Sequence, residues 1–572
     1  MIPVPRGKID EYTQKGWWGN TTVLDLFFET VRKRPDAEAL VDPLNRADLI
    51  GGKAKRLTYR ETATRVDRLA LGFERLGIQK DDVILVQLPN VVESVLVFFA
   101  AARIGAISSP LSMMARSREV GHALEATQAK AVVTVGKFNG FDHLGLMAGL
   151  KERFDFLKQI ILAGEGREQG VSRLETLLSH NIDPPLPVTY FDGKASGPNE
   201  IFTICWTSGT EAEPKGVPRT HNHWIAIARV TAEGCRVKEG DNIHGTFPVI
   251  NMAGIGGLMV PWVLTGGKFV LHHPFDIGVF FKQMATENIY YTLMPPALLD
   301  TLAKSPKACA IQESNVKVIA SGSVPLSPWM VKYYQETFNI SIVNFFASNE
   351  GIALFSGPGL FPDPDDRARY FPRFGCKEVS LDISDRVIGG MDSAIVDVMT
   401  GEEITETGVV GELCFKGSTM FEGYWQQRAL TEKAFDARGY YHSGDLFSIQ
   451  GEGRDKLLFH GRFKDLIIRG GQNISPEEVE TLVVGHPGIV EAAAVGYPDP
   501  RLGERTCVFV VVPPGRTITL EEIVLYLGEQ GVAKYKYPER LEVLEQLPRS
   551  ALNKVLRRKL RDMLNHKPAK EQ

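Results

Sequence analysis

Short β-rich runs that alternate with helical stretches constrain this chain more than any other feature. Between residues 59 and 77, apolar residues recur at helical spacing until Gly77 ends the run. Strand-like runs follow at 83–90, 131–135, 201–206, 317–321 and 341–346. Strands separated by helices predict parallel α/β sheets.

The pattern changes twice towards the end of the chain. After about residue 380 the strands shorten and turns multiply, as in "GVVGELCFKG", which predicts an antiparallel or barrel-like unit. After about residue 462 come a helix, two strands and a terminal helix, enough for a small α+β domain. We expect the basic run from 554 to 561 to lie on a solvated helix face.

Charge and composition exclude several classes of function. The net charge of −4 offers no general attraction to nucleic acid or to an anionic membrane. The uncharged window 245–267 contains two prolines and six glycines, so we interpret it as buried chain and expect no integral membrane segment. The six cysteines form no CxxC pair, and the histidines lack partner ligands at useful spacing. Both patterns indicate a cytoplasmic protein with reduced thiols and no metal bound by histidine.

Three of the strands end in polar loops that contain glycine: "TSGTEAEPKG", "SGSVPLS" and "ASNEG". Ligands of open parallel sheets bind beyond the carboxyl ends of strands, so the loops predict one shared site. The first loop is not a P-loop, because Pro214 precedes Lys215 and a glycine follows it. Its hydroxyls, its glycines and its lysine nevertheless suit phosphate.

Five motifs occur in one order between residues 207 and 557: "TSGTxxxPKG", "ASNE", "SGD", "GRFKDLIIRGGQNISP" and "PRSALNKVLR". Together they resemble the adenylate-forming superfamily of acyl-CoA synthetases, aryl-CoA ligases and standalone adenylation enzymes. The chain looks nearest to cyclohexanecarboxylate-CoA ligases and medium-chain acyl-CoA synthetases.

The resemblance implies an α/β fold with two domains. The N-terminal domain, residues 1–461, would consist of two doubly wound sheets and a small β-barrel-like unit. The C-terminal domain, residues 462–572, would be small, mobile and α+β, with its hinge near Lys464.

The resemblance also implies the reaction. A carboxylate attacks the α-phosphate of ATP, giving acyl-AMP and pyrophosphate, and a thiol such as that of coenzyme A then displaces AMP. Positive charge and hydrogen-bond donors around the phosphate would provide most of the catalysis. The expected cofactors are ATP/AMP, Mg²⁺ and coenzyme A.

Individual roles are implied residue by residue. Lys554 and Thr207 would be catalytic, Glu350 would bind Mg²⁺, and Gly470 and Gly471 would give coenzyme A access. The substrate pocket would be formed by Asn251, Met252, Gly254, Ile255 and Gly322. Nucleotide-binding residues would be Thr207, Ser208, Gly209, Thr210, Lys215, Gly322, Ser323, Val324, Pro325, Asn344, Phe345, Phe346, Ala347, Asn349, Asp445, Arg462 and Lys554.

The phosphate loop departs from the family at Glu211 and Ala212, where threonine and glycine are usual. Glu211 either points outward, helps to hold Mg²⁺, or repels phosphate and weakens the retention of ATP and pyrophosphate.

The expected substrate is an apolar monocarboxylic acid, because no lysine or arginine occurs in 247–262, 320–325 or 344–354 to pair a second carboxylate. Gly254, Gly256 and Gly257 are expected to leave room for it. The opening segment 12–27 resembles both cyclohexanecarboxylate-CoA ligases and dihydroxybenzoate-AMP ligases, so alicyclic, aromatic and medium-chain acids stay open.

Three functions remain: an acyl-CoA ligase, possible in either direction; an adenylation enzyme that loads a separate carrier protein; and an inactive nucleotide-binding homologue. The expected partners are the small carboxylic acid and coenzyme A, without nucleic acid. Monomer and homodimer both stay open.

Overall fold

The computed structural model describes residues 1–166, 169–179, 189–207, 214–305, 308, 311, 314–375, 383–388, 390–469, 472–530, 532–549 and 555–565. The chain divides into two compact units. Unit 1 comprises Met1–Asp392 and Phe415–Tyr441, and unit 2 comprises Ser393–Cys414 and His442–Gln572. The predicted domain boundary at 461/462 falls within unit 2 and stays a prediction.

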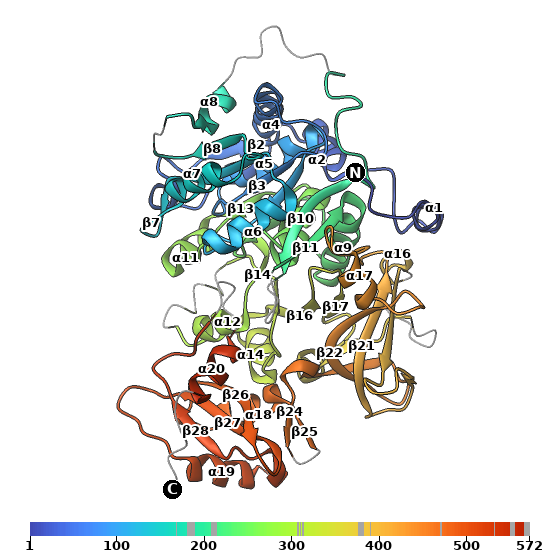
Figure 1. Ribbon diagram of the computed structural model, residues 1–572, viewed down its shortest axis with the longest axis vertical. Coiled ribbons are helices and arrows are strands. Elements are labelled where there is room, and N and C mark those ends of the chain that lie inside the picture. Colours follow the sequence, from blue (N-terminus) through green and yellow to red (C-terminus); the bar gives the residue numbers. More distant parts are fainter. Residues whose placement is uncertain are drawn as a thin grey trace. The chain divides into compact units, whose positions relative to one another are not determined.

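The first sheet of unit 1 is parallel except at one edge. Its strands lie in the order β11 (Lys215–Thr220), β10 (Ile201–Thr207), β4 (Ile107–Pro110), β3 (Val83–Val86), β5 (Ala131–Val135), β8 (Gln159–Ala163) and β9 (Ser172–Arg173). Only β11 runs antiparallel to its neighbour. Helices α6 (Ser117–Thr127) and α7 (His143–Arg153) bury apolar side chains on one face of this sheet. It has the parallel form that the strand and helix pattern predicted (Figure 1).

The second sheet contains the other strands that end near the predicted site. Its order is β17 (Ala353–Ser356), β16 (Ser341–Ala347), β15 (Val318–Gly322), β14 (Ile289–Leu293), β12 (Asn242–Gly245), β13 (Phe269–Leu271), β1 (Glu38–Val41) and β2 (Arg56–Thr58). The two edge strands, β17 and β2, are antiparallel to their neighbours. Helices α11 (Ile277–Thr286), α12 (Pro296–Ala303) and α14 (Pro328–Phe338) cover one face of it.

Helix α5 (Val92–Arg103) is apolar except for Glu93 and Ser94 in its first turn and Arg103 at its end, and residues 92–102 are all buried. A helix without a polar face must be covered all round. It packs on β3 and β4, and its Phe99 stacks on Trp262 of α10 (Val260–Thr265), with ring centroids 6.0 Å apart. Trp262 also stacks on Phe269 of β13. Aromatic packing therefore joins the core of one sheet to the other.

Unit 2 begins with antiparallel strands and ends with an α+β fold. The first group lies in the order β23 (Lys456–Arg462), β22 (Tyr441–Gln450), β21 (Val410–Gly417), β19 (Met391–Val396) and β20 (Glu403–Ile404). The second group lies in the order β25 (Gln472–Ile474), β24 (Ile467–Arg469), β27 (Gly503–Val511) and β26 (Glu491–Asp499), and β28 (Arg540–Val543) also pairs with β27. The helices there are α18 (Pro476–Val484), α19 (Leu520–Glu529) and α20 (Arg557–Asn565). The predicted α/β class, with a large N-terminal part and a smaller C-terminal part, is confirmed.

The expectation of a solvated basic face near the C-terminus is wrong for Arg557. Its guanidinium bonds Glu480 of α18 at 2.8 Å and Glu477 at 3.0 Å, and its side chain is only 17% exposed. These acids lie far from Arg557 in the sequence, so its charge pattern alone could not reveal them. The ion pairs attach α20 to α18.

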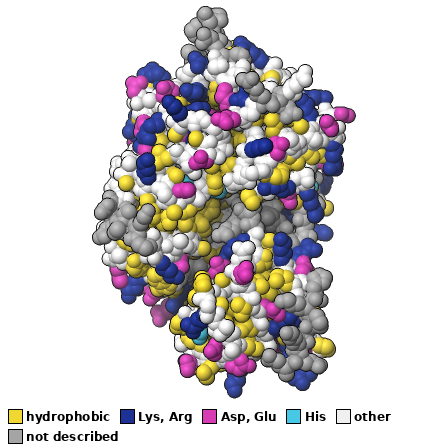
Figure 2. Space-filling model, turned by 90° about the vertical axis from the view of Figure 1, so that its left-hand side faces the viewer, with side chains coloured by type: hydrophobic (Ala, Val, Ile, Leu, Met, Phe, Trp, Pro, Cys, Tyr) yellow, Lys and Arg dark blue, Asp and Glu magenta, His cyan; other side chains and the backbone are white. Residues whose placement is uncertain are grey.

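Window 245–267 contains a π-helix, Met252–Met259, followed by α10, and most of its apolar residues are buried as expected. No helix within the described ranges is both long and apolar enough to span a bilayer. On the face drawn in Figure 2, basic and acidic side chains are interspersed, in keeping with the small net charge.

His221, the first residue of α9 (His221–Gly234), makes an acid-sensitive core contact. Its Nδ1 accepts a bond from the Val23 N–H at 3.2 Å, so Nε2 carries the proton and donates to Ser196 Oγ at 2.8 Å. Burial lowers the pKa of His221 to about 3. Between that pH and the ordinary value of about 6.5, the unfolded chain binds one more proton here than the folded chain does.

We expect stability to fall with pH below about 6.5, by about 1.4 kcal/mol per pH unit for this site alone. His221→Gln removes that contribution. Urea unfolding at pH 7 and pH 5 should therefore show wild type losing about 2 kcal/mol more than the variant. Equal losses of unfolding free energy in wild type and His221→Gln would contradict the assignment of this pH dependence to His221.

Candidate active site

Strands β10 and β11 form the base of the predicted phosphate loop. Thr207 and Lys215 lie opposite each other in the antiparallel pair. Ser208, Gly209, Thr210 and Glu211, which join these strands, lie outside the described residues, as do Gly470, Gly471 and Lys554. The structure thus places the two ends of the loop side by side.

Asn349 ties three segments of the site together. Its Nδ2 donates to the carbonyl of Trp206 on β10 at 3.2 Å, and its Oδ1 accepts from the N–H of Met252 at 2.9 Å. The end of β10, the loop after β16 and the start of the π-helix therefore meet at one side chain. The amide predicted to contact phosphate is partly used for this tie.

Glu350 is buried, and one of its carboxylate oxygens is occupied. Tyr424 donates its hydroxyl to Oε1 at 3.1 Å, and among the described residues none donates to Oε2. Lys215 Nζ lies 4.6 Å from the centroid of the Tyr424 ring. Burial, followed by the charge of Glu350, raises the pKa of Tyr424, so its proton stays on the bond to the acid. The Glu350 carboxylate, the Tyr424 phenol and the Lys215 side chain therefore lie next to one another.

Sequence reasoning missed Tyr424. The segment "GYW" reaches the site because Trp425 N donates to the Gly216 carbonyl at 2.8 Å, and the Trp425 indole donates to Ala126 at 3.0 Å. An aromatic pair between the "ASNE" and "SGD" motifs was the only signal.

Arg219 of β11 was also missed, although it follows the "PKG" of the phosphate-loop motif by only three residues. It is fully buried, donates Nη1 to the carbonyl of Asn349 at 3.3 Å, and lies 5.0 Å from the Trp224 ring. Nε and Nη2 have no hydrogen-bond acceptor among the described residues. Burial lowers the pKa of Arg219 to about 10 against the opposing pull of Glu350, so it stays positive at neutral pH behind the acid.

The ends of β15 and β16 lie as close together as a glycine permits. A Cβ on Gly322 would lie 2.2 Å from the carbonyl oxygen of Phe345. Ser323, with φ of +80°, Val324 and Pro325 follow as an exposed turn. This turn is available for the base-side role that the motif predicts.

Side chains along β16 alternate between two faces. Asn344 is buried and donates Nδ2 to the Ala368 carbonyl at 3.0 Å, which fixes α15 (Pro364–Arg369). Phe346 lies edge-on to Phe371 at 6.1 Å and is half-buried, while Ala347 is exposed. Phe345 faces the opposite side, towards Phe355 at 6.0 Å. The nucleotide role of these four residues stays a prediction.

Asn251 begins the π-helix as its N-cap. Its Oδ1 accepts from the N–H groups of Ala253 and Gly254 at 3.1 and 3.2 Å. Met252 and Ile255 are buried. Asn251 thus has a structural task at the place where the substrate pocket is predicted.

The expectation that glycines 254, 256 and 257 leave room is wrong. A Cβ on Gly254 would lie 1.9 Å from the Pro248 carbonyl oxygen, and the other two positions are filled by Ile227 and Leu293. These glycines allow close packing of the π-helix instead of opening a cavity.

Unit 2 holds the predicted ribose-binding acid. Asp445 on β22 is buried, lies opposite Arg462 on β23 and receives Arg462 Nε at 3.0 Å. The charge of Asp445 is the main cause that raises the pKa of Arg462. Lys464, the predicted hinge residue, lies in a 3₁₀ turn, Phe463–Asp465. Asp445 and Arg462 thus form a pair, and their nucleotide role stays a prediction.

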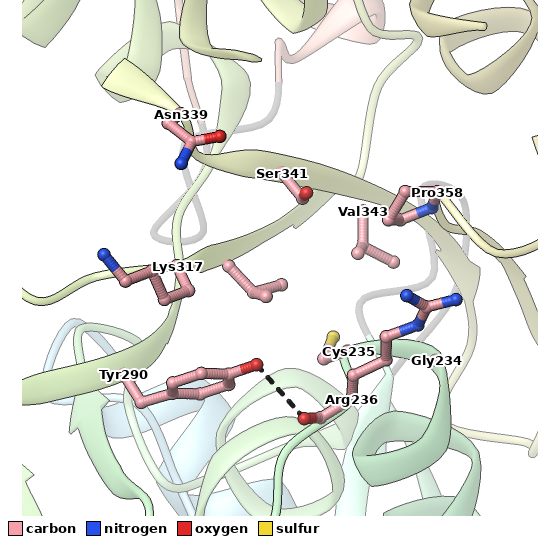
Figure 3. Close-up of a pocket in the computed structure, with 10 residues that line it drawn as sticks. Gly234, Cys235, Arg236, Tyr290, Lys317, Asn339, Ser341, Val343 and Pro358 are labelled. Carbon is pink, nitrogen blue, oxygen red and sulfur yellow. Dashed lines mark hydrogen bonds between the residues drawn. The ribbon is translucent and has the colours of Figure 1, made fainter. Parts of the chain in front are cut away.

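A cavity of about 210 Å³ lies at the amino ends of strands in the second sheet, whereas the candidate active site lies at their carboxyl ends (Figure 3). Tyr290, Lys317 and Ser341 line it near the amino ends of β14, β15 and β16. Tyr290 donates its hydroxyl to the Arg236 carbonyl at 3.2 Å. Ligands of parallel sheets bind at carboxyl ends, so this cavity is separate from the candidate active site.

Comparison with known proteins links the chain to one family. Residues 27–425 match the model of AMP-binding enzymes, and residues 478–554 match the AMP-binding enzyme C-terminal domain. The 2,3-dihydroxybenzoate-AMP ligase of Bacillus subtilis is 28% identical over 99% of this chain and 98% of its own length. The medium-chain fatty-acid–CoA ligase of Escherichia coli is 29% identical over 95% and 90%. The anthranilate CoA ligase AuaEII, in complex with anthranoyl-AMP, shares the fold, with a TM-score of 0.79, 19% identity and coverage of 95% and 97%.

Proposed function

This chain belongs to the family of AMP-binding enzymes, and from that premise we propose that it is an acid–thiol ligase. It joins an apolar monocarboxylic acid to AMP at the expense of ATP and passes the acyl group to coenzyme A. In the first step a carboxylate oxygen bonds the α-phosphorus and pyrophosphate leaves. In the second step the thiol sulfur bonds the acyl carbon, AMP leaves and the thiol proton passes to solvent.

The group Glu350, Tyr424 and Lys215 supports this proposal best. A buried carboxylate with one oxygen held by a phenol, and the other without a donor in the described part of the chain, suits a hard cation such as Mg²⁺. Bound there, Mg²⁺ would neutralise phosphate charge. Lys215 stands at the base of the phosphate loop and offers positive charge to the same anion. Arg219 adds a second, buried cation behind Glu350.

The motif resemblance supports five further roles, three of them at residues outside the described ranges (Gly470, Gly471 and Lys554). Lys554 bridges the acid and the α-phosphate during adenylation, and Asp445 receives the ribose hydroxyls. Lys464 is the hinge about which the C-terminal part turns, and Gly470 and Gly471 admit the pantetheine arm.

The proposed acid is apolar and carries one carboxylate. The segment around the π-helix offers Ile250, Met252 and Ala253 and no basic residue to pair a second charge. A buried, unpaired carboxylate costs several kcal/mol, so a dicarboxylic acid should be rejected.

A second candidate is an aryl-acid adenylation enzyme that loads a separate carrier protein. The similarity to 2,3-dihydroxybenzoate-AMP ligase over nearly the whole chain favours it. The two candidates share the first half-reaction and differ only in the thiol that accepts the acyl group.

Purified protein, ATP, Mg²⁺ and a panel of aromatic, alicyclic and medium-chain acids, with and without coenzyme A, test the proposal. AMP and acyl-CoA production that depends on coenzyme A is the expected result. Pyrophosphate exchange and acyl-AMP accumulation without acyl-CoA would favour carrier loading, and neither product would contradict both.

A matched acid pair tests the pocket charge. Cyclohexanecarboxylate is expected to be activated at least about 100-fold better than cyclohexane-1,4-dicarboxylate, because the second carboxylate lacks a partner. Comparable kcat/KM for the two acids would contradict an apolar pocket.

A further inference from the structure

Three side chains of types that can bind metal lie together on two neighbouring strands in unit 2. Glu412 and Cys414 stand two residues apart on β21, so both side chains project from the same face. His442 lies on the adjacent strand β22. The intervening Leu413 projects to the other face and is fully buried. Alternation along β21 therefore places a carboxylate and a thiol together beside an imidazole.

The donor atoms are already close to one another. Cys414 Sγ lies 3.4 Å from His442 Nδ1, and Nδ1 lies 2.8 Å from Glu412 Oε2. All three donor atoms lie within 4.8 Å of one another. Zinc bonds of 2.0–2.3 Å in tetrahedral geometry place ligand atoms about 3.3–3.6 Å apart. The thiol–imidazole distance already matches this spacing, and the imidazole–carboxylate contact would open by about half an ångström.

The surroundings orient the ligands and leave one side open. Gly444 N–H donates to Glu412 Oε1 at 2.7 Å, which holds the carboxylate with Oε2 towards the histidine. Such outer bonds commonly fix metal ligands. Cys414 is buried, whereas the Glu412 and His442 side chains are 16% and 33% exposed. A fourth position can therefore be filled by water.

We propose that Glu412, Cys414 and His442 form a zinc-binding site. A thiolate and an imidazole select Zn²⁺ over Mg²⁺ or Ca²⁺, which prefer oxygen ligands only. On binding, Cys414 releases its thiol proton to the buffer, and His442 gives up the Nδ1–H bond to Glu412 and carries its proton on Nε2 instead, so that Nδ1 can coordinate. This site uses none of the residues assigned to Mg²⁺ or to the acyl group, and it stands independently of the proposed function.

The full-length chain, stripped with a chelator and desalted, is titrated with ZnCl₂ in the presence of excess MgCl₂. We expect one zinc per chain, one proton released and a rise in Tm, because zinc binds the folded state. Cys414→Ser and His442→Gln should each weaken zinc binding at least about 10-fold. Cys507→Ser is the matched control: it removes another buried cysteine of the same unit and should leave binding unchanged.

A second measurement covers variants that fail to fold. Wild type loaded with Co²⁺ should show a thiolate-to-cobalt charge-transfer band, which Cys507→Ser retains. Absence of that band, no zinc retained by wild type, or equal zinc binding by folded Cys414→Ser would overturn the site and leave the three side chains as a hydrogen-bonded group.

Discussion

Replacing Glu350 by glutamine is expected to slow acyl-AMP formation about 100- to 1,000-fold. The amide oxygen of glutamine can still accept the Tyr424 hydroxyl, so packing is retained. It lacks the negative charge that a hard cation needs from its ligand. Acid-dependent exchange of pyrophosphate into ATP, measured over a range of Mg²⁺ concentrations, checks this result.

Glu422→Gln is the matched control for this experiment. Glu422 is a half-buried glutamate two residues before Tyr424, but its carboxylate pairs with Lys8 Nζ at 2.6 Å. The pyrophosphate-exchange activity of Glu422→Gln should stay within about threefold of the wild-type activity, because Glu422 is assigned no contact with ATP, Mg²⁺ or the acid. Equal losses in the two variants, or a Glu350→Gln enzyme with unchanged exchange, would remove Glu350 from the cation site.

Replacing Arg46 by methionine is expected to lower the free energy of unfolding by about 3–5 kcal/mol at pH 7. Arg46 is buried and bonds Asp42 at 2.8 Å and Glu93 at 2.7 Å. Asp42 also accepts the N–H of Val92 at the start of α5. The variant leaves two carboxylates in the core, with Lys55 still bonded to Glu93. Urea unfolding measures the loss.

The loss should depend on pH in a defined direction. Burial and then the charge of Glu93 raise the pKa of Asp42 to about 6 even with Arg46 present. Without the arginine the folded chain binds a proton there that the unfolded chain, with a carboxyl pKa near 3.9, does not bind. Stability of the variant should therefore fall as pH rises from about 4 towards 7.

A double variant separates charge from packing. Arg46→Met together with Glu93→Leu replaces the ion pair by apolar side chains and should recover all but about 1.5 kcal/mol of the loss. A single variant as stable as wild type at pH 7, or a double variant no better than the single one, would contradict this account.

The sequence alone was enough to predict the class of fold and the family. Strand and helix periodicity predicted parallel α/β sheets, which unit 1 contains, and motif order identified an adenylate-forming enzyme, which the family match confirms. These features are local, because periodicity and spacing can be recognised without knowing which distant residues are in contact. Buried positions in window 245–267 were predicted for the same reason.

Side-chain partners depended on the tertiary structure. Tyr424 and Arg557 are joined to acids far away in the chain, so their roles were invisible in the sequence. The glycines of the π-helix looked like open space, because composition cannot reveal that Pro248, Ile227 and Leu293 fill the positions beside them.

The spacing of residues in the sequence thus predicted where the chain turns and which chemistry its motifs suit. Only the packed structure decided which oxygen of Glu350 is used, that Arg219 is buried behind it, and that Glu412, Cys414 and His442 share one face. The physical reason is that hydrogen bonds and buried charges act over a few ångströms in space, whatever their separation in the sequence.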